Sequence, residues 1–269
     1  VIRGEDHLAN TAKQILLYEA LDLNIPIFAH TPLILNSEGK KLSKRDGVTS
    51  ISEFKKMGYT SEAMANYMTL LGWSLPEGIN ERFKISEISD LFSFEKVNKA
   101  SAKFDWDKLN WLNSQVIHEM APKTLLDNLD PLFKKNGWEI PSKEWGESLV
   151  DLIGPSMILL NDGIDQAKPF FEEPKLNEDG KKQLKINESK VILNFILDEL
   201  KKINTSFIDE KKAIDLINQA KDTCNVKKGL VMKSLRAALF GTLNGPDLIK
   251  SWVLLSRFSK DRVRIRSFI

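Results

Sequence analysis

Residues 25–47 read IPIFAHTPLILNSEGKKLSKRDG and join an apolar segment to a strongly basic loop. The apolar and β-branched run at 25–35 is short and contains prolines near both ends, which predicts a buried β-strand. Upstream, residues 8–21 predict an amphipathic helix, because apolar residues recur at i, i+4, i+7 and i+8. These residues are Leu8, Ala12, Ile15 and Leu16. Helix, strand and loop in this order predict part of an α/β sheet, whose ligands bind where strands end.

The basic loop at residues 39–47, GKKLSKRDG, places four cations within six positions between two glycines. The ammonium groups of Lys41 and Lys44 and the hydroxyl of Ser43 can converge on several phosphate oxygens. A triphosphate suits such a loop better than a singly charged anion. The sequence contains neither GxxxxGK[ST] nor GxGxxG, so the loop is not one of those phosphate-binding motifs. The alternative is a solvated surface turn, because most charge runs face water.

Beyond residue 50 the pattern becomes helical. Ser50 and Glu53 form a capping box, and Pro122 occupies a favoured position at a helix start. A helical apolar stripe is expected at Ala63, Tyr67, Leu70 and Leu71. The polar, turn-rich stretch 171–183 separates further helices, one of which is expected to stop at Gly241. The predicted fold class is therefore mainly α, preceded by a remnant of an α/β domain, with domain boundaries near residue 121 and within 171–183.

Composition excludes several classes of function. No apolar run approaches the ~20 residues of a membrane helix, and 39 basic against 37 acidic residues leave a net charge of only +2. Any nucleic-acid interface must therefore depend on local clusters of charge. One cysteine, Cys224, allows no internal disulfide and no cysteine-rich zinc cage, so we expect no structural zinc and a cytoplasmic protein. The chain begins at Val1 without an initiator methionine, so we interpret it as a fragment of a longer protein.

Several blocks in order resemble bacterial glutamyl-tRNA synthetases, a family of class I aminoacyl-tRNA synthetases. The blocks are VIRGEDHLANTAKQILLYEAL (1–21), FAHTPLIL (28–35), KLSKR (41–45), GVTSISEFKKMGYTSEAMANYMTLLGWSLPEG (47–78), FSFEKVNKASAKFDWDKLNWLNSQ (92–115) and LRAALFGTLNGPDL (235–248). The resemblance covers essentially the whole chain. It implies the C-terminal part of a Rossmann-type catalytic domain at 1–47, a helical stem-contact domain at 48–120, and two helical anticodon-binding subdomains at 121–174 and 175–269.

The same resemblance assigns chemistry to residues. The KLSKR loop would close over ATP, supplied with Mg²⁺, while glutamate is activated and then transferred to the terminal adenosine of tRNA. The implied ATP-binding residues are Asp6, Lys41, Leu42, Ser43, Lys44 and Arg45. Lys44 and Lys41 would be catalytic, because they stabilise the triphosphate as the carboxylate attacks the α-phosphorus. Arg3 would grip the amino acid, since a guanidinium binds a carboxylate bidentately; the alternative is an ion pair with Glu5 or Asp6. His7 would bind the amino acid or only shape its pocket.

One element of the family pattern is missing. Class I synthetases need H-x-G-H, and none of the three histidines, His7, His30 and His118, lies in that pattern. We therefore expect the first half of the catalytic domain to be absent and the fragment alone to be inactive. Two other interpretations are open: a tRNA-binding adaptor without catalysis, and a glutaminyl-tRNA synthetase, whose anticodon module is built of β-barrels. The expected partners are glutamate, tRNA-Glu and tRNA-Gln, with the protein a monomer.

Anticodon reading is predicted from LVDLIGPSMILL, residues 149–160. Some family members place an arginine there, whereas this chain has Gly154, Pro155 and Ser156. Because none of the three supplies a charged, planar donor, we predict a non-discriminating enzyme that also charges tRNA-Gln. Exposed tryptophans can stack on unpaired bases; the candidates are Trp106, Trp111, Trp138 and Trp145, although Trp111 is expected in the core. The basic tail RFSKDRVRIRSF (257–268) is expected to be a nucleic-acid contact or a solvated helix face.

Overall fold

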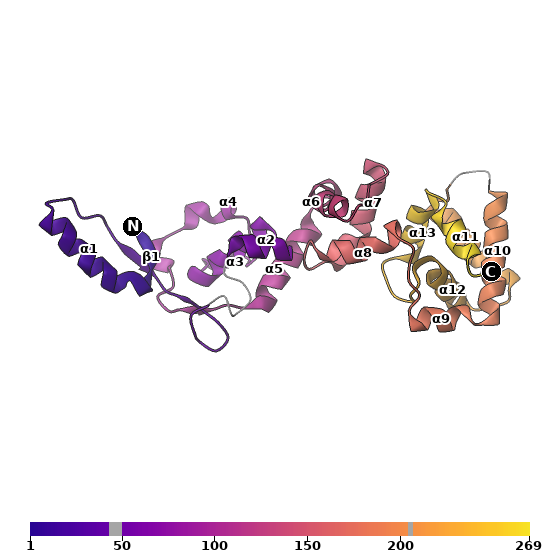
Figure 1. The fold of residues 1–269 in the computed structure, drawn as a ribbon, viewed down its shortest axis with the longest axis horizontal. Coiled ribbons are helices and arrows are strands. Elements are labelled where there is room, and N and C mark those ends of the chain that lie inside the picture. The colour runs from indigo at the N-terminus through magenta and orange to yellow at the C-terminus, as the bar shows by residue number, and fades with distance from the viewer. Residues whose placement is uncertain (43–49, 204–206) are drawn as a thin grey trace. The chain divides into compact units, whose positions relative to one another are not determined.

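The computed structural model describes residues 1–42, 50–203 and 207–269, which form two compact units (Figure 1). The first unit contains Val1–Glu119 with Met157–Asn161, and the second contains Met120–Ser156 with Asp162–Ile269. Helices dominate both units, and the sheets are small, so the predicted mainly α class with an α/β remnant is confirmed. No helix in the described ranges has the length and apolar character needed to cross a membrane.

The first unit begins with short strands around one helix. Its elements are β1 (Ile2–Gly4), the 3-10 turn η1 (Glu5–His7), α1 (Leu8–Ala20), β2 (Ala29–Thr31) and β3 (Ile34–Leu35). Strands β1 and β2 pair in parallel, with Arg3 opposite His30, and β3 pairs in parallel with β4 (Ala102–Lys103). The run 25–35 therefore forms two short strands that belong to different two-stranded sheets. Strand β4 fixes the end of β3 against the helical part of the same unit.

Burial in residues 1–42 differs from the sequence prediction. Thr11 is the only buried residue of that range, whereas Leu16 is 65% exposed and Ile27 is 91% exposed. The predicted helix exists, and its apolar face is largely exposed. The run 25–35 was predicted to be a buried strand; that prediction is wrong, because none of its residues is buried. Amphipathic spacing identifies the apolar face of a helix but does not show which element packs against it. In the described parts of the chain no element covers the apolar face of α1.

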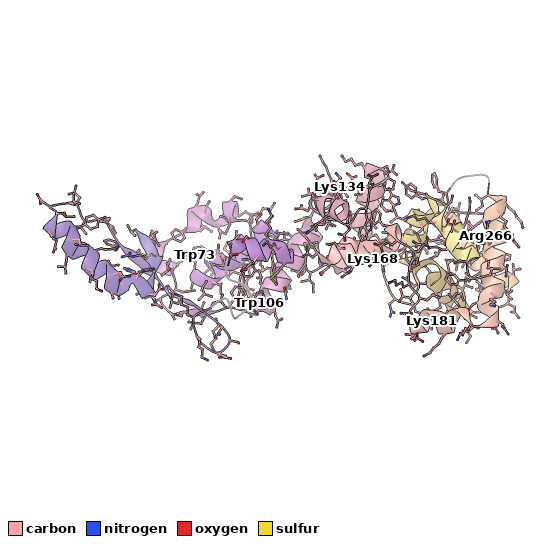
Figure 2. The ribbon with its side chains drawn as sticks, in the orientation of Figure 1. Trp73, Trp106, Lys134, Lys168, Lys181 and Arg266 are labelled. Carbon is pink, nitrogen blue, oxygen red and sulfur yellow. The ribbon has the colours of Figure 1, made fainter. Side chains whose placement is uncertain are left out.

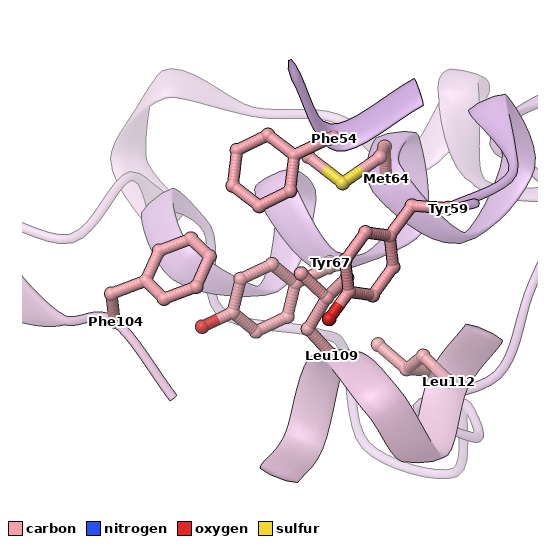
Figure 3. Close-up of a cluster of buried hydrophobic side chains, with 7 residues drawn as sticks. All are labelled: Phe54, Tyr59, Met64, Tyr67, Phe104, Leu109 and Leu112. Carbon is pink, nitrogen blue, oxygen red and sulfur yellow. The ribbon is translucent and has the colours of Figure 1, made fainter. Parts of the chain in front are cut away.

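The rest of the first unit is a small helical domain with its own core. Its helices are α2 (Ile51–Met57), α3 (Ser61–Gly72), α4 (Ile85–Ile88) and α5 (Trp106–Glu119), with 3-10 turns η3 (Ser89–Leu91) and η4 (Phe94–Lys96). The predicted capping box of Ser50 and Glu53 begins α2. Figure 3 shows the buried cluster in which aromatic side chains from α2, α3 and the β4–α5 connection meet. It comprises Phe54, Tyr59, Met64, Tyr67, Phe104, Leu109 and Leu112.

Tyr67 lies at the centre of this cluster and supports the connection between β4 and α5. Burial raises the pKa of Tyr67 to about 12, so the phenol stays neutral at physiological pH. Its hydroxyl oxygen accepts a hydrogen bond from the backbone N–H of Asp105 at 2.6 Å. Of the predicted stripe on α3, Ala63 and Tyr67 are buried, and Leu70 and Leu71 are partly buried. The predicted stripe is confirmed.

The described residues of the second unit form helices and connecting loops without strands. Its elements are α6 (Pro122–Lys135), α7 (Lys143–Ile153), η5 (Gly154–Ser156), α8 (Asp162–Phe171), α9 (Glu178–Leu184), α10 (Asn187–Lys202), α11 (Glu210–Thr223), α12 (Lys228–Phe240), α13 (Leu248–Ser256) and α14 (Lys260–Arg266). As predicted, Pro122 begins α6 and Gly241 ends α12 in a left-handed conformation. Both predictions rest on local backbone chemistry.

Buried polar bonds tie the halves of this unit together. The indole N–H of Trp145 on α7 donates to the carbonyl of Leu254 on α13 at 3.0 Å. The buried guanidinium of Arg264 on α14 donates to the carbonyls of Leu239 and Glu172, each at 2.7 Å. These bonds satisfy carbonyls near the ends of α12 and α8, which lack partners within their own helices. Helices from before and after residue 174 are therefore packed into one compact unit.

Candidate functional site

The first candidate site lies where η1 approaches the start of the basic loop. Lys41 follows a tight turn in which Asn36 N–H donates to Lys40 O at 2.7 Å, and Leu42 N–H donates to Ile34 O at 2.9 Å. Gly39 adopts φ 79° in this turn, a conformation that favours glycine. The turn directs the Lys41 ammonium to the Asp6 carboxylate, 2.6 Å away. The structure thus brings Asp6 and Lys41 together, although they lie 35 positions apart in the sequence.

The Asp6–Lys41 pair is exposed to solvent. The hydrogen bond from Lys41 lowers the pKa of Asp6, with a further Coulombic contribution from the same ammonium group. An exposed ion pair contributes little to stability, so incoming phosphates can replace the carboxylate as the partner of Lys41. Leu42, the next predicted ATP-binding residue, is half-buried and packs against the Phe54 cluster. Ser43, Lys44 and Arg45 lie outside the described residues.

Arg3, the predicted amino-acid-binding residue, is held by polar groups of α1. Its Nη2 atom donates to the side-chain oxygens of Thr11 and Gln14, the latter at 2.6 Å. Its guanidinium carbon lies 5.3 Å from the centre of the Phe28 ring, a favourable cation–π position. Within residues 1–42 Arg3 forms no ion pair with Glu5 or Asp6. A cavity of about 400 Å³ adjoins Arg3, with Gln14, Tyr18 and Phe28 in its wall.

His7 is exposed at the start of α1. Its Nδ1 atom lies 3.3 Å from the amide nitrogen of Asn10, and its backbone carbonyl accepts a hydrogen bond from Thr11 at 3.1 Å. Sequence reasoning missed Thr11 and His30, although both contact the environment of Arg3. The sequence held only an indirect indication of their position. Side chains alternate between the two faces of a strand, but Arg3 and His30 can be assigned to neighbouring positions only once the pairing of β1 with β2 is known.

The second candidate site is a cavity of about 350 Å³ in the helical unit. Its wall includes Ser156 and Gln166, the loop residues Gly245 and Pro246, and Arg236 from α12. Burial lowers the pKa of Arg236, and the charge of Asp247 opposes that shift. Gly245 adopts φ 143°, and a Cβ atom there would lie 3.1 Å from Arg236 Nη1. A side chain at position 245 would therefore crowd the guanidinium of Arg236.

The two predicted anticodon positions differ in their surroundings. Ser156 is exposed, lines the cavity, and donates through Oγ to Gln166 Oε1 at 2.6 Å. Gly154 is buried, and a Cβ atom there would lie 2.9 Å from a methyl carbon of Leu125. Ser156 is thus the position from which a longer side chain could reach a ligand. Arg236 was missed as a site residue; the signal was one cation within the apolar run of α12 just before a glycine-rich loop.

The structure decides between the alternatives for some of the tryptophans and for part of the basic tail. Trp111 is 45% exposed, so its predicted core position is wrong, whereas Trp138 and Trp145 are buried and cannot stack on bases. Figure 2 labels Trp106, which is half-buried and packs against Phe54 and Phe104. In the tail, Lys260 donates to the carbonyls of Phe170 and Phe171, and Arg264 is buried. Two cations of the tail therefore act as an internal clamp: Lys260 and Arg264 donate to backbone carbonyls at helix ends, which lack donors within their own helices.

The described residues contain no cluster of three or more His, Cys, Asp or Glu side chains able to hold a metal ion. Asp6 is the acidic side chain adjoining Lys41. Mg²⁺ commonly binds through one or two carboxylates together with substrate phosphates. The residues present therefore fit a magnesium ion that arrives with a nucleotide, and they provide no separate protein cage for it.

Comparison with known families defines the class. Residues 1–111 match the family model for the catalytic domain of class I tRNA synthetases (E and Q), and residues 117–269 match that of an anticodon binding domain. The chain therefore belongs to the class I tRNA synthetases.

Within that class the chain is similar to glutamate-tRNA ligases. It is 80% identical over 269 residues to the glutamate-tRNA ligase of Prochlorococcus marinus (strain NATL2A), and 60% identical over 266 residues to that of strain MIT 9313. A crystal structure of a glutamate tRNA ligase from Elizabethkingia meningosepticum in complex with its amino acid has a TM-score of 0.84 at 29% identity. The chain is covered fully or almost fully in each case, and it spans 56% of each relative.

Proposed function

We propose that the chain is part of an ATP-dependent glutamate-tRNA ligase. The observation that carries the proposal is the Asp6–Lys41 contact, which joins the two motifs VIRGEDH and KLSKR at one place. A tRNA-binding adaptor has no need of this arrangement. The helical anticodon-binding unit also argues against a glutaminyl enzyme, whose corresponding module is built of β-barrels. The single cysteine, which forms no disulfide within the chain, supports a protein that functions in the reducing cytoplasm.

In the proposed reaction a carboxylate oxygen of glutamate attacks the α-phosphorus of ATP, and pyrophosphate leaves. Lys41 and Lys44 neutralise the triphosphate as charge moves to the leaving group. Asp6, Leu42, Ser43 and Arg45 complete the nucleotide contacts on this side, and magnesium bound to ATP adds positive charge at the phosphates. Arg3, with His7 nearby, binds the amino acid. The glutamyl group of the resulting glutamyl-adenylate then passes to a ribose hydroxyl of the terminal adenosine of tRNA, and AMP leaves.

The test uses a completed enzyme, meaning this chain joined to the remaining sequence of the Prochlorococcus marinus (strain NATL2A) relative. Lys44→Ala should lower glutamate-dependent exchange of pyrophosphate into ATP by roughly 100- to 1,000-fold, the size of one preorganised transition-state contact. Lys40→Ala, which removes a neighbouring cation paired with Glu38, is the control and should keep most of the activity. Near-normal exchange in Lys44→Ala would contradict the assigned role. The 269-residue chain alone should not charge tRNA.

We further propose that the enzyme charges both tRNA-Glu and tRNA-Gln. Support comes from Ser156, which offers a hydroxyl and no cation at the exposed edge of the second cavity. The completed enzyme should glutamylate both tRNAs at rates within tenfold, and Ser156→Arg should create a preference of roughly 10- to 100-fold, since one base contact contributes ~1–3 kcal/mol. A hundredfold preference of the unmodified enzyme for tRNA-Glu, lost in Arg236→Gln, would contradict the proposal and identify Arg236 as the reader.

A further inference from the structure

Thr11 is the only buried residue in residues 1–42, and it is polar, with 5% of its surface exposed. Its hydroxyl oxygen contacts three other elements. It lies in hydrogen-bonding contact with Arg3 Nη2 of β1, 3.1 Å from the carbonyl oxygen of His7, and 2.8 Å from His30 Nε2 of β2. Arg3 and His30 are register partners in the parallel β1–β2 pair. Helix α1 therefore places Thr11 over the side chains of a cross-strand pair.

Counting protons fixes the direction of each bond. A hydroxyl donates one hydrogen and accepts two. The carbonyl of His7 can only accept, so Thr11 donates to it. Arg3 can only donate, so it occupies one lone pair of the Thr11 oxygen. His30 Nε2 must then carry a hydrogen and donate to the second lone pair. Every bonding position of the Thr11 hydroxyl is filled, which makes it a saturated junction between β1, η1, α1 and β2.

We propose that Thr11 is the positioning residue that holds the Arg3 guanidinium for the amino acid; this rests on the proposed role of Arg3 in binding glutamate. Arginine has a long, flexible side chain, and bidentate binding of a carboxylate requires its plane to be fixed. Both Nη2 hydrogens are donated here, to Thr11 and Gln14, so a bidentate carboxylate would displace the exposed Gln14 while Thr11 keeps the plane fixed. Thr11 supplies a fixed acceptor because its own oxygen is held from three sides. The other partner of Nη2, Gln14, is exposed and makes no comparable set of bonds within the described ranges.

Two features distinguish this role from simple packing. No other residue in the range 1–42 is buried, so Thr11 does not contribute to a local apolar core. Valine has nearly the same shape as threonine but no hydroxyl, and it would leave the bonding groups of Arg3, His7 and His30 without their shared partner. Arg3 Nε is buried without a partner in the described part of the chain, so loss of the Thr11 hydroxyl would leave Gln14 and the Phe28 ring as the contacts of the guanidinium there.

The experiment measures glutamate KM and kcat of the completed enzyme by pyrophosphate exchange in the presence of tRNA-Glu. Thr11→Val should raise KM for glutamate roughly 10- to 100-fold, the effect of losing one hydrogen bond to a charged group. Its kcat at saturating glutamate and its KM for ATP should change less than threefold. Thr11→Ser keeps the hydroxyl and should keep KM within threefold of the unmodified enzyme. Glu19→Ala, which removes an exposed side chain further along α1, is the control and should change KM less than twofold.

The outcomes separate this proposal from the one on which it rests. If Arg3→Ala leaves glutamate KM unchanged, the proposed role of Arg3 fails. If Arg3→Ala raises KM but Thr11→Val does not, the positioning role alone fails. In the Arg3→Ala background Thr11→Val should add less than a twofold effect; a full multiplicative effect would overturn the proposal. Should Thr11→Val not fold, Thr11→Ser decides, because a tenfold rise of KM despite the retained hydroxyl contradicts the proposal.

Discussion

The N-terminal segment at residues 1–42 and the helical unit that begins at Met120 handle apolar residues in opposite ways. The segment exposes most of its large apolar side chains and buries one threonine. The helical unit buries complete apolar faces, together with Trp145, Trp252 and Arg264. A segment without a core is organised by polar contacts, whereas a unit with a core derives its stability from packing. Substitutions should therefore affect chemistry in the first region and folding in the second.

The largest expected effect is on the folding of the helical unit. Trp145→Ala removes a fully packed indole, its bond to Leu254, and edge contacts with Phe171 and Phe258. It should lower the free energy of unfolding by roughly 3–5 kcal/mol. Urea unfolding of the 269-residue chain, followed by circular dichroism, measures this loss. Trp111→Ala is the matched control and should cost under about 1 kcal/mol, because that indole is exposed. Equal losses would remove the distinction between buried and exposed tryptophans.

Arg264 provides the next test, because it is polar but belongs to the packed region. Arg264→Ala leaves the carbonyls of Leu239 and Glu172 without their donor. It should lower the free energy of unfolding by roughly 2–4 kcal/mol, since each buried carbonyl without a hydrogen bond costs ~1–3 kcal/mol. Arg266, two residues further along α14 and labelled in Figure 2, is exposed. Arg266→Ala should therefore change stability by less than about 0.5 kcal/mol. Thermal and urea unfolding of both variants measure the difference. A small loss in Arg264→Ala would mean that the clamp does not stabilise the unit.

The extent of sequence prediction follows the same contrast. The capping box at Ser50, the helix start at Pro122 and the helix end at Gly241 were predictable because each depends on the backbone chemistry of a few neighbouring residues. Burial of the run 25–35 and of Trp111 was mispredicted because burial depends on which other element covers a face, and the local sequence carries no such information. In the site, Asp6, Lys41 and Arg3 came from motif resemblance. Their actual bonding partners, Thr11 and Gln14 among them, required the pairing of strands and the position of α1.

A smaller effect should come from the exposed apolar face of α1. Leu16→Ala in the 269-residue chain should change the free energy of unfolding by less than about 0.5 kcal/mol, because the side chain is already in water. Leu149→Ala in α7 is the control and should cost roughly 2–5 kcal/mol, because Leu149 is fully buried. The comparison is read from urea unfolding curves of both variants. A loss above about 2 kcal/mol in Leu16→Ala, the size expected for a core leucine, would show that the segment has a core of its own.

A pH-dependent effect concerns a buried carboxylate inside the packed unit. Asp261 accepts a hydrogen bond from the indole N–H of Trp252 through Oδ2 at 2.9 Å, while Oδ1 is buried without a partner in the described ranges. Burial raises the pKa of Asp261, against the opposing influences of the Trp252 hydrogen bond and the Arg262 charge. The folded state thus holds the proton of Asp261 more tightly than the unfolded state. A stabilising contribution is then present below the unfolded pKa, and it is lost as pH rises through the folded pKa.

Asp261→Asn stays uncharged and lacks this pH dependence, so its stability relative to the unmodified chain should increase as pH is raised from about 4 to about 7. A difference of one between the folded and unfolded pKa of Asp261 corresponds to about 1.4 kcal/mol in that comparison. Asp198→Asn provides a control of opposite sign. The hydrogen bond from Lys201 lowers the pKa of Asp198, so its contribution is present above the unfolded pKa and is lost as pH falls.

Urea unfolding of the unmodified chain and the two variants at several pH values, compared as differences from the unmodified chain, cancels the titration of all other groups. As pH rises, Asp261→Asn should become more stable relative to the unmodified chain. Asp198→Asn should become slightly less stable relative to the unmodified chain over the same pH range. Slopes of the same sign would mean that burial does not govern the pKa of Asp261. In that case even a buried position of the helical unit would leave its carboxylate solvated, and the contrast with the N-terminal segment would rest on apolar packing alone.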